Sequence, residues 1–315
     1  MARRPVSLVL AAVLLTGSAG LAPWTNYLPA SDTAPSAIPS GILFHKRVEE
    51  VDVTFAVRNR QGRALADLTP DDVTVFADGT AVPSLTSFHV GNNVPLQVTL
   101  MLDTSDSMGN GFSGEQAAAM SFLRNIIRPE IDEASVVAFA TDPNAGQFRG
   151  QPQLLQTAVD HFRAAGQTAL YDALYGATQE SLISGQGQRA RRAIVLLSDG
   201  EDNWSRNNLQ DVIESAQRSD VAIYAITAHS RKWEYPGDRV LNRLTAETGG
   251  CAFILDNFSH ADQAFARIAA ELRSQYRLSF RAPAARLGYH SLHISLRRQG
   301  KWQVRSRTGY FSSLE

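Results

Sequence analysis

The chain has 315 residues, 44% of them hydrophobic and 19% charged, and a formal net charge of −1. This length and composition predict a globular protein of about two domains and exclude collagen-like, coiled-coil and fully disordered chains. The balanced net charge gives no overall attraction for a polyanion, so we expect no nucleic-acid partner. The charge is uneven along the chain, however, because residues 96–270 sum to −7 and residues 271–315 to +7.

The N-terminus has the three-part layout of a secretory signal. Arg3 and Arg4 precede an apolar run at 6–15, and small residues follow at 16–20. Because the apolar run is too short for a comfortable membrane span, we predict a signal peptide at 1–22 and export to the periplasm or the extracellular space. An uncleaved N-terminal anchor is the alternative. Residues 23–44, rich in Pro, Ser and Ala, are predicted to form a disordered linker.

Two segments with strand patterns flank the centre of the chain. Residues 45–94 contain the alternating run VDVTFAV (51–57) and then VTVF (73–76), which is followed by a hairpin signal, Asp78-Gly79. Residues 276–315 contain further strand-like runs at 276–280, 292–296 and 302–305. The first segment is marginal as an independent domain. Because the termini of an inserted domain often lie close together, we predict that both segments complete one small β-sandwich.

The centre, residues 95–275, alternates apolar runs with amphipathic helical patterns. The apolar runs lie at 96–102, 135–140, 193–197, 221–228 and 251–255. The helical patterns lie near 115–127, 153–164, 170–183, 208–219, 239–248 and 261–275. This alternation predicts an α/β domain with a parallel sheet that helices cover on both faces. The only cysteine, Cys251, excludes an intramolecular disulfide, and we expect it to be a buried strand residue rather than a reactive thiol.

A polar motif follows the first central strand. Asp103, Ser105 and Ser107 are spaced two residues apart, at the strand end where open parallel sheets bind ligands. Oxygen donors at this spacing can face one point. They suit Mg²⁺, Mn²⁺ or Ca²⁺, and the lack of Cys or His pairs nearby argues against zinc.

Two further motifs are expected at the same edge of the sheet. Thr168 precedes the helical pattern at 170–183, and Asp199 follows the strand at 193–197. Thr168 offers a third hydroxyl and Asp199 a second carboxylate. Each has an ordinary alternative, since Thr168 can cap a helix and Asp199-Gly200 can form a turn that ends a strand.

Together and in this order, the motifs resemble the von Willebrand factor type A domain, whose metal-ion-dependent adhesion site uses Asp-x-Ser-x-Ser, a loop threonine and a distal aspartate. All five positions are matched here by Asp103, Ser105, Ser107, Thr168 and Asp199. The chain is also similar to the exported VWFA-related domain proteins known from acidobacteria, through the segments DLTPDDVTVFADG (67–79), TALYDAL (168–174), LLSDGEDN (196–203), TGG (248–250), ELRSQYRLSF (271–280) and TGYF (308–311).

The resemblance implies a doubly wound sheet and a divalent cation, Mg²⁺ or alternatively Mn²⁺ or Ca²⁺. It implies that Ser105 and Ser107 bind the cation directly, Thr168 directly or through water, and Asp103 and Asp199 largely through waters. An open coordination position would then accept a carboxylate from a protein partner, so the function implied is binding or adhesion rather than catalysis. One departure is Asp106, where many relatives carry glycine, and we expect its side chain to point away.

Two other functions stay open at this point. The cation can act as a structural staple with no partner, in a scaffold protein of the cell envelope. A hydrolase is the second alternative, because Asp103-Thr104-Ser105 superficially resembles the aspartic-protease turn, although Asp199 lies between a buried strand and a helix instead of in an all-β fold.

The loops at 201–204 and 231–237 are expected to set partner specificity. They carry Glu201, Asp202 and Trp204 in the first loop, and Trp233 and Tyr235 in the second. Exposed aromatic side chains are common anchors of protein interfaces. The alternative is that Trp233 and Tyr235 only pack their loop onto a helix.

Overall fold

A computed structural model describes residues 50–91, 94–107, 112–144, 146–184, 190–229, 235–282 and 287–312, with the backbone alone at 112, 113, 115 and 182–184. The predicted signal peptide (1–22) and linker (23–44) lie outside these ranges. All the described residues belong to one compact unit of the chain. Within the described ranges, the helices are too short or too polar to cross a membrane.

The centre of the chain forms a six-stranded sheet in the order β10-β9-β8-β5-β6-β7. Its strands are β5 (Leu96–Asp103), β6 (Glu133–Phe139), β7 (Gly146–Gly150), β8 (Arg191–Leu197), β9 (Val221–Ala228) and β10 (Ala252–Leu255). All neighbours are parallel except β6 and β7, which are antiparallel. Because helices cover both faces, residues at successive positions of the central strands are buried, as Leu100, Met101 and Leu102 in β5 illustrate.

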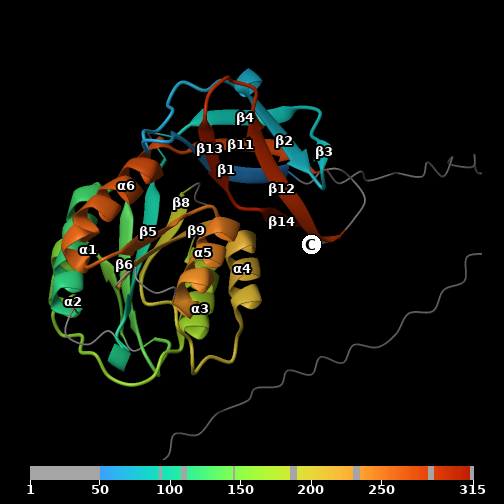
Figure 1. Ribbon diagram of the computed structural model, residues 1–315. Coiled ribbons are helices and arrows are strands. Elements are labelled where there is room, and N and C mark those ends of the chain that lie inside the picture. Colours follow the sequence, from blue (N-terminus) through green and yellow to red (C-terminus); the bar gives the residue numbers. More distant parts are fainter. Residues whose placement is uncertain are drawn as a thin grey trace, which may run out of the picture. The chain divides into compact units, whose positions relative to one another are not determined.

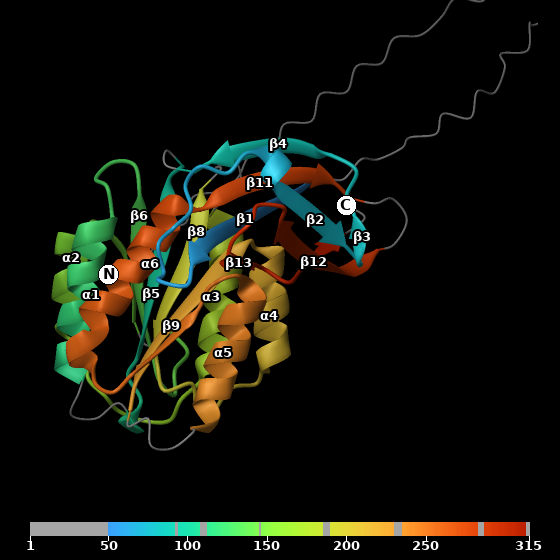
Figure 2. The same ribbon diagram turned by 45° about the horizontal axis from the view of Figure 1, so that its top comes forward.

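In the described part of the chain, six helices cover the two faces of this sheet. They are α1 (Phe112–Ile126), α2 (Pro152–Val159), α3 (Leu170–Ser184), α4 (Leu209–Arg218), α5 (Pro236–Thr248) and α6 (Ala261–Ser274). One core joins α1, α2 and α6 to the sheet, and a second core joins α3, α4 and α5. Figures 1 and 2 show these two layers on opposite sides of the strands. The structure therefore confirms the predicted α/β fold with helices on both faces.

Local signals set several helix ends. The side chain of Asn208 accepts hydrogen bonds from the amides of Gln210 and Asp211, and so caps α4. Helix α5 begins at Pro236, three residues before the predicted start, because proline is favoured in the first turn of a helix. The helix ends at Thr248, and Gly249 caps it with a φ of +92°, which favours glycine; a Cβ there would lie 2.8 Å from the amide nitrogen of Arg307.

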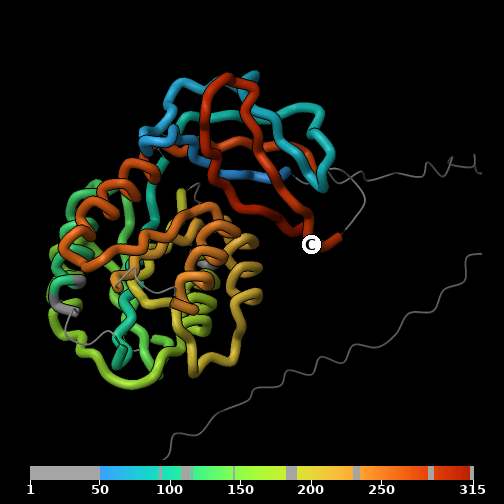
Figure 3. The backbone as a smooth tube through the Cα atoms, viewed as in Figure 1, coloured from blue at the N-terminus to red at the C-terminus, as the bar shows by residue number. Residues whose placement is uncertain are grey.

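The flanking segments form two four-stranded antiparallel sheets, β13-β1-β11-β4 and β14-β12-β2-β3. The strands are β1 (Glu50–Asn59), β2 (Val73–Ala77), β3 (Thr80–Ala81), β4 (Leu85–Val90), β11 (Tyr276–Arg281), β12 (Gly288–Leu296), β13 (Trp302–Ser306) and β14 (Gly309–Ser312), and a short 3₁₀ helix at Pro70–Asp72 precedes β2. Each sheet mixes strands from both ends of the described chain, and one apolar core lies between them. The tube in Figure 3 shows the blue and red segments side by side. The predicted sandwich from both flanking segments is confirmed.

Buried charges connect helices and strands where the two parts of the fold meet. The carboxylate of Glu271, at the end of α6, lies 2.6 Å from Arg58 Nε in β1 and 2.9 Å from Arg305 Nη1 in β13. Asp132, before β6, pairs with Arg128 and Arg273 at 2.8 and 2.6 Å. These guanidinium hydrogen bonds outweigh the effect of burial and hold the pKa of Asp132 well below its usual value.

Candidate metal centre

The loop after β5 carries Asp103, Ser105 and Ser107 in a defined arrangement. Asp103 is the last residue of the strand and fully buried, and its Oδ1 accepts a hydrogen bond from the amide of Ser105 at 3.0 Å. The hydroxyls of Ser105 and Ser107 are 3.1 Å apart. Thr104 fixes the loop to the end of β6, because its amide and its hydroxyl both donate to the carbonyl of Phe139. Three of the predicted ligands are therefore held together by local geometry.

Ser198, which the sequence analysis did not assign to the site, binds its central carboxylate. Its hydroxyl, buried at the end of β8, donates to Asp103 Oδ2 at 2.6 Å. The parallel pairing of β5 with β8 brings these two strand ends together. In the sequence, Ser198 could be noticed only as a hydroxyl residue next to Asp199 in the motif LLSDG. That its hydroxyl binds Asp103 follows from the pairing of β5 with β8, which the sequence does not state.

Burial raises the pKa of Asp103 to about 6, and the nearby negative charge of Asp199 acts in the same direction. The hydrogen bonds from Ser105 and Ser198 oppose this shift, because they stabilise the ionised carboxylate. A divalent cation close to Asp103 would also favour its ionised form. The buried carboxylate is thus a group whose charge a bound cation would balance.

The loop that carries Thr168 is hydrogen-bonded to the loop after β5. The amide of Ala165 donates to the carbonyl of Thr104 at 2.7 Å, and Asp106 and Gly166 exchange two hydrogen bonds of 3.0 Å. One of these bonds uses Asp106 Oδ1, so this side chain is directed to the amide of Gly166 on the neighbouring loop. The carboxylate of Asp106 bridges the two loops and helps to set the position of buried Thr168.

The loop after β8 covers the start of α3. The amides of Tyr171 and Asp172, in the first turn of this helix, donate to Asp202 Oδ1 and to the hydroxyl of Ser205. These two side chains therefore perform the capping role that was the alternative interpretation of Thr168. The backbone carbonyl of Thr168 accepts hydrogen bonds from the amides of Asn203 and Trp204.

Asp199 is half-buried in a tightly packed turn. Its Oδ1 accepts the amide of Glu201 at 3.0 Å, as in an ordinary turn, and no described residue donates to its second carboxylate oxygen. The N-terminus of α5 packs directly on this turn, since a Cβ at Gly237 would lie 1.9 Å from the carbonyl oxygen of Asp199. Asp199 therefore serves the turn and still keeps one oxygen available for a cation or its waters.

The donor set fits a hard divalent cation. It consists of three hydroxyls and two carboxylates on loops that are joined by hydrogen bonds, and oxygen donors of this kind suit Mg²⁺, Mn²⁺ and Ca²⁺. No group of three His, Cys, Asp or Glu side chains in the described ranges could hold a metal ion by itself. Binding at this edge would therefore depend on the hydroxyls of Ser105, Ser107 and Thr168, and the assignment of these ligands stays a prediction.

Aromatic side chains lie on both loops that were expected to set specificity. Trp204 is 55% exposed, while its backbone is bonded to Thr168. Tyr235 is 37% exposed and lies with its ring 4.1 Å from the imidazole of His229. Tyr235 thus packs onto its neighbours and also presents a surface, and Trp233 lies outside the described residues.

A second polar cluster, in the sandwich, has the residue types of a serine hydrolase. His290 lies 2.7 Å from Asp78 through Nδ1 and 3.0 Å from the hydroxyl of Ser312 through Nε2. His290 and Ser312 are only 4% and 8% exposed, and the imidazole stacks on Tyr310. Because a substrate could not approach a hydroxyl buried in this way, we assign the cluster to the packing of β12 against β2 and β14.

The comparisons with known proteins agree with this architecture. The sequence profile described as von Willebrand factor type A domain matches residues 97–267. No curated protein sequence matches the chain.

Several solved structures are similar to the chain at low sequence identity. A von Willebrand factor type A protein from Catenulispora acidiphila is 14% identical, with a TM-score of 0.48 and coverage of 85% of this chain and 75% of that one. Proximal thread matrix protein 1 from the mussel byssus is 15% identical, with a TM-score of 0.47, and the match covers 66% of this chain but only 51% of the mussel chain. BatB from Bacteroides thetaiotaomicron is 17% identical, with a TM-score of 0.42 and coverage of 57% and 100%.

Proposed function

Because the chain belongs to the von Willebrand factor type A domain family, whose members commonly mediate protein interactions and often bind a divalent metal, we propose that it is an exported binding protein that engages its partner through a cation. The cation is held by Asp103, Ser105, Ser107, Thr168 and Asp199, and Mg²⁺ is the first choice, with Mn²⁺ or Ca²⁺ as alternatives. The partner is a protein that presents the carboxylate of an Asp or Glu side chain.

One observation carries this proposal, namely the buried carboxylate of Asp103 at the centre of a neutral hydroxyl cluster. Ser105 and Ser198 donate hydrogen bonds to it, and the hydroxyl of Ser107 lies 3.1 Å from that of Ser105. Neutral hydroxyls as direct ligands would leave a bound dication strongly attractive to a further anionic ligand. The chain's own residues then orient the hydroxyls, keep Asp103 ionised and leave the partner's carboxylate as the completing group.

The proposed role is binding without catalysis. Domains of this family are generally interaction modules. At the site itself, Asp103 is enclosed by Ser105 and Ser198 and is fully buried, so it is poorly placed to exchange a proton with a substrate. The carboxylates and hydroxyls of the cluster suit cation binding better than nucleophilic attack.

Export rests on the sequence alone. The basic pair Arg3-Arg4, the apolar run at 6–15 and the small residues at 16–20 support a signal peptide, and the periplasm or the extracellular space is the proposed location. Mass spectrometry of the mature N-terminus would test this part of the proposal. A new N-terminus near residue 22 is expected, and an intact Met1 in a membrane fraction would instead support the uncleaved anchor.

The alternative, a structural staple, is weakened by the bonds that already join the loops. Asp106 bonds to Gly166, Thr104 to Ala165 and Ser198 to Asp103. A cation would add stability by binding the native state, but the loops do not depend on it for their connection.

The decisive experiment is cross-linking and capture of partners from the native envelope, with the full chain as bait, in Mg²⁺ and in EDTA. Circular dichroism must show that the bait stays folded in both buffers. We expect a partner that is captured in Mg²⁺, lost in EDTA, and lost with Asp103→Ala. A partner that stays bound in EDTA would contradict the cation bridge, whereas a folded protein that gains stability with Mg²⁺ but captures nothing would support the staple.

A further inference from the structure

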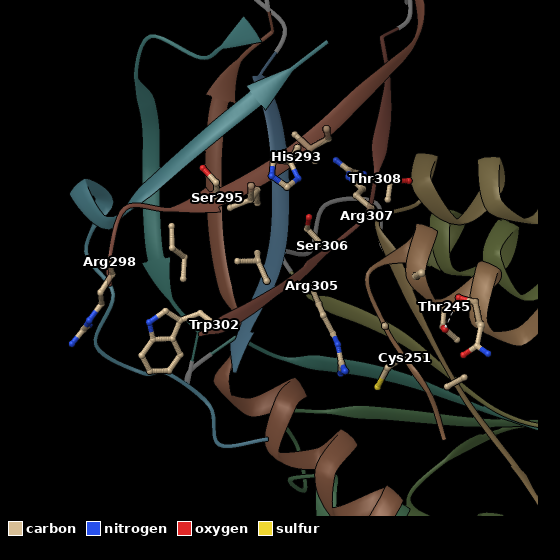
Figure 4. A pocket seen from close by; sticks show the side chains of 18 of the residues that line it. Thr245, Cys251, His293, Ser295, Arg298, Trp302, Arg305, Ser306, Arg307 and Thr308 are labelled. Atoms are coloured by element: carbon tan, nitrogen blue, oxygen red, sulfur yellow. Dashed lines mark hydrogen bonds between the residues drawn. The ribbon is translucent and has the colours of Figure 1, made fainter. Parts of the chain in front are cut away.

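A pocket of about 690 Å³ lies far from the metal centre, beside the sandwich. Its walls come from α5, from the amino end of β10, from β12 and from β13, as Figure 4 shows. The proposed cation site lies beyond the opposite, carboxyl ends of β5 and β8. This volume is within the usual range for a ligand pocket, so the space is large enough for a bound molecule.

Two open strand edges face this pocket. β13 pairs only with β1 in the described part of the chain. β14 pairs with residues 288–291 of β12, and the amide of Leu292 donates to the carbonyl of Thr308. Among the described strands, residues 293–296 of β12 pair only with β2. Alternate residues of an edge strand direct both the N–H and the C=O away from their neighbour, so the outer edge of β13 offers hydrogen bonds to a further strand. Proteins commonly use such an edge to bind an extended peptide.

The described residues that line the pocket include three arginines and no Asp or Glu. Arg298 and Arg305 contribute guanidinium groups, and Figure 4 shows the side chain of Arg305 directed towards Cys251. The guanidinium of the third arginine, Arg307, donates to the carbonyls of Gln217 and Asp52 and lies 3.5 Å from Asp220, so it adds little to this charge. Arg305 and Arg58 share the single buried carboxylate of Glu271, so this group of three carries one net positive charge. Such a surplus attracts an anionic ligand.

The carboxylate contact of Arg298 does not cancel the attraction. Arg298 forms a bidentate pair with Asp67, but both side chains are substantially exposed, and an exposed pair contributes little free energy. A ligand carboxylate can therefore replace or join Asp67 at low cost. Trp302 and Val304, on β13, add apolar surface to the same pocket.

We propose that this pocket binds an extended acidic segment of a partner protein, which adds to the outer edge of β13 as a further strand. The backbone of the segment pairs with residues 302–306. Its acidic side chains meet Arg298 and Arg305, and its apolar side chains cover Trp302 and Val304. Five residues of strand span about 17 Å, so a segment of five or six residues is sufficient. This second binding surface is independent of the cation site.

The probe is an acetylated hexapeptide, Glu-Val-Glu-Val-Glu-Val, with a fluorescein label, and fluorescence anisotropy with the full chain measures its binding. We expect saturable binding that EDTA and Asp103→Ala leave unchanged. The Lys-Val counterpart should not bind. Because a hydrogen bond to a charged group contributes about 1.5–3 kcal/mol, Arg305→Gln should weaken binding about tenfold or more.

Arg297→Gln is the matched control, because Arg297 precedes Arg298, is exposed and bonds to Thr74 instead of lining the pocket. It should bind the peptide as the unchanged protein does. Arg58 remains on Glu271 in Arg305→Gln, so we expect that variant to fold, and Trp302→Ala provides a second pocket variant. Absence of binding, or equal binding to both pocket variants and the control, would overturn the proposal.

Hydrogen exchange distinguishes strand addition from simple charge attraction. Bound peptide should slow exchange at backbone amides within residues 302–306, because those on the outer edge gain hydrogen-bond acceptors. Binding without protection of these amides would show that the acidic segment does not add to β13, and would also overturn the proposal.

Discussion

Replacing Ser198 with alanine tests the interpretation of the buried carboxylate. The hydroxyl of Ser198 donates to Asp103 Oδ2 at 2.6 Å, and this bond is one of those that lower the pKa of Asp103 against the effect of burial. A hydrogen bond to a charged group contributes about 1.5–3 kcal/mol. Cation binding requires the ionised carboxylate, so the loss of this donor should weaken the affinity for Mg²⁺ or Mn²⁺ by about 10- to 100-fold.

The assay is a calorimetric titration of the full chain with Mn²⁺ at pH 7.5, together with circular dichroism. Ser135→Ala is the matched control, because Ser135 in β6 also carries a mostly buried hydroxyl, which lies 2.9 Å from that of Thr99, outside the proposed site. The control should retain the affinity of the unchanged protein. Equal affinities for Ser198→Ala and for the control, with both proteins folded, would refute the claim that Ser198 sustains the charge of Asp103.

Three further predictions concern the site and the fold. Asp103→Ala should abolish Mn²⁺ binding while the sheet stays folded, and an unchanged affinity in the same titration would mean that the cation site is elsewhere. Asp132→Asn should reduce the free energy of unfolding at pH 7 by about 2 kcal/mol, because the carboxylate binds two guanidinium groups. Since the pKa of Asp132 is lowered in the folded state, this contribution is present above about pH 4 and falls as the pH decreases further. Denaturant titrations would contradict this if the free energy of unfolding had the same pH dependence in the variant and in the unchanged protein. Deletion of residues 276–315 removes every strand that pairs with β1 in the described chain, so limited proteolysis should become faster within 50–91, and unchanged resistance there would contradict the shared sandwich.

The central sheet could be predicted because its strands are continuous apolar runs. The run at 221–228, for example, is buried on both faces and coincides with β9. β7 was missed because it is short, contains a single large apolar residue, Phe148, and lies at the edge of the sheet with its side chain 43% exposed. A strand that pairs with one neighbour and buries few side chains needs few apolar residues, so its sequence shows no strong hydrophobic pattern.

The site could be predicted only where ligands are close in sequence or match a family motif. Asp103, Ser105 and Ser107 are held by their own loop. The roles of Ser198 and Asp106 depend instead on contacts across 95 and 60 residues, which strand order and loop packing decide. Cys251 was expected to be buried within a strand. It is half-buried directly before β10, and burial raises the pKa of its thiol to about 11, as expected for an unreactive thiol.

The shared sandwich has a consequence for the order in which the protein can fold. β1 to β4 are synthesised first, but their partners β11 to β14 follow only after the entire α/β domain. In the pair of β1 with β11, for example, Glu50 lies opposite Arg281. At about 5–20 residues per second, roughly 10–40 s separate the synthesis of β4 from that of β11. During that interval the first strands have unpaired edges and an uncovered apolar face, which favour association with other chains. The N-terminal strands are therefore the part of this protein for which we expect the greatest need of a chaperone, and the closing of the sandwich is expected to be its last and slowest folding step.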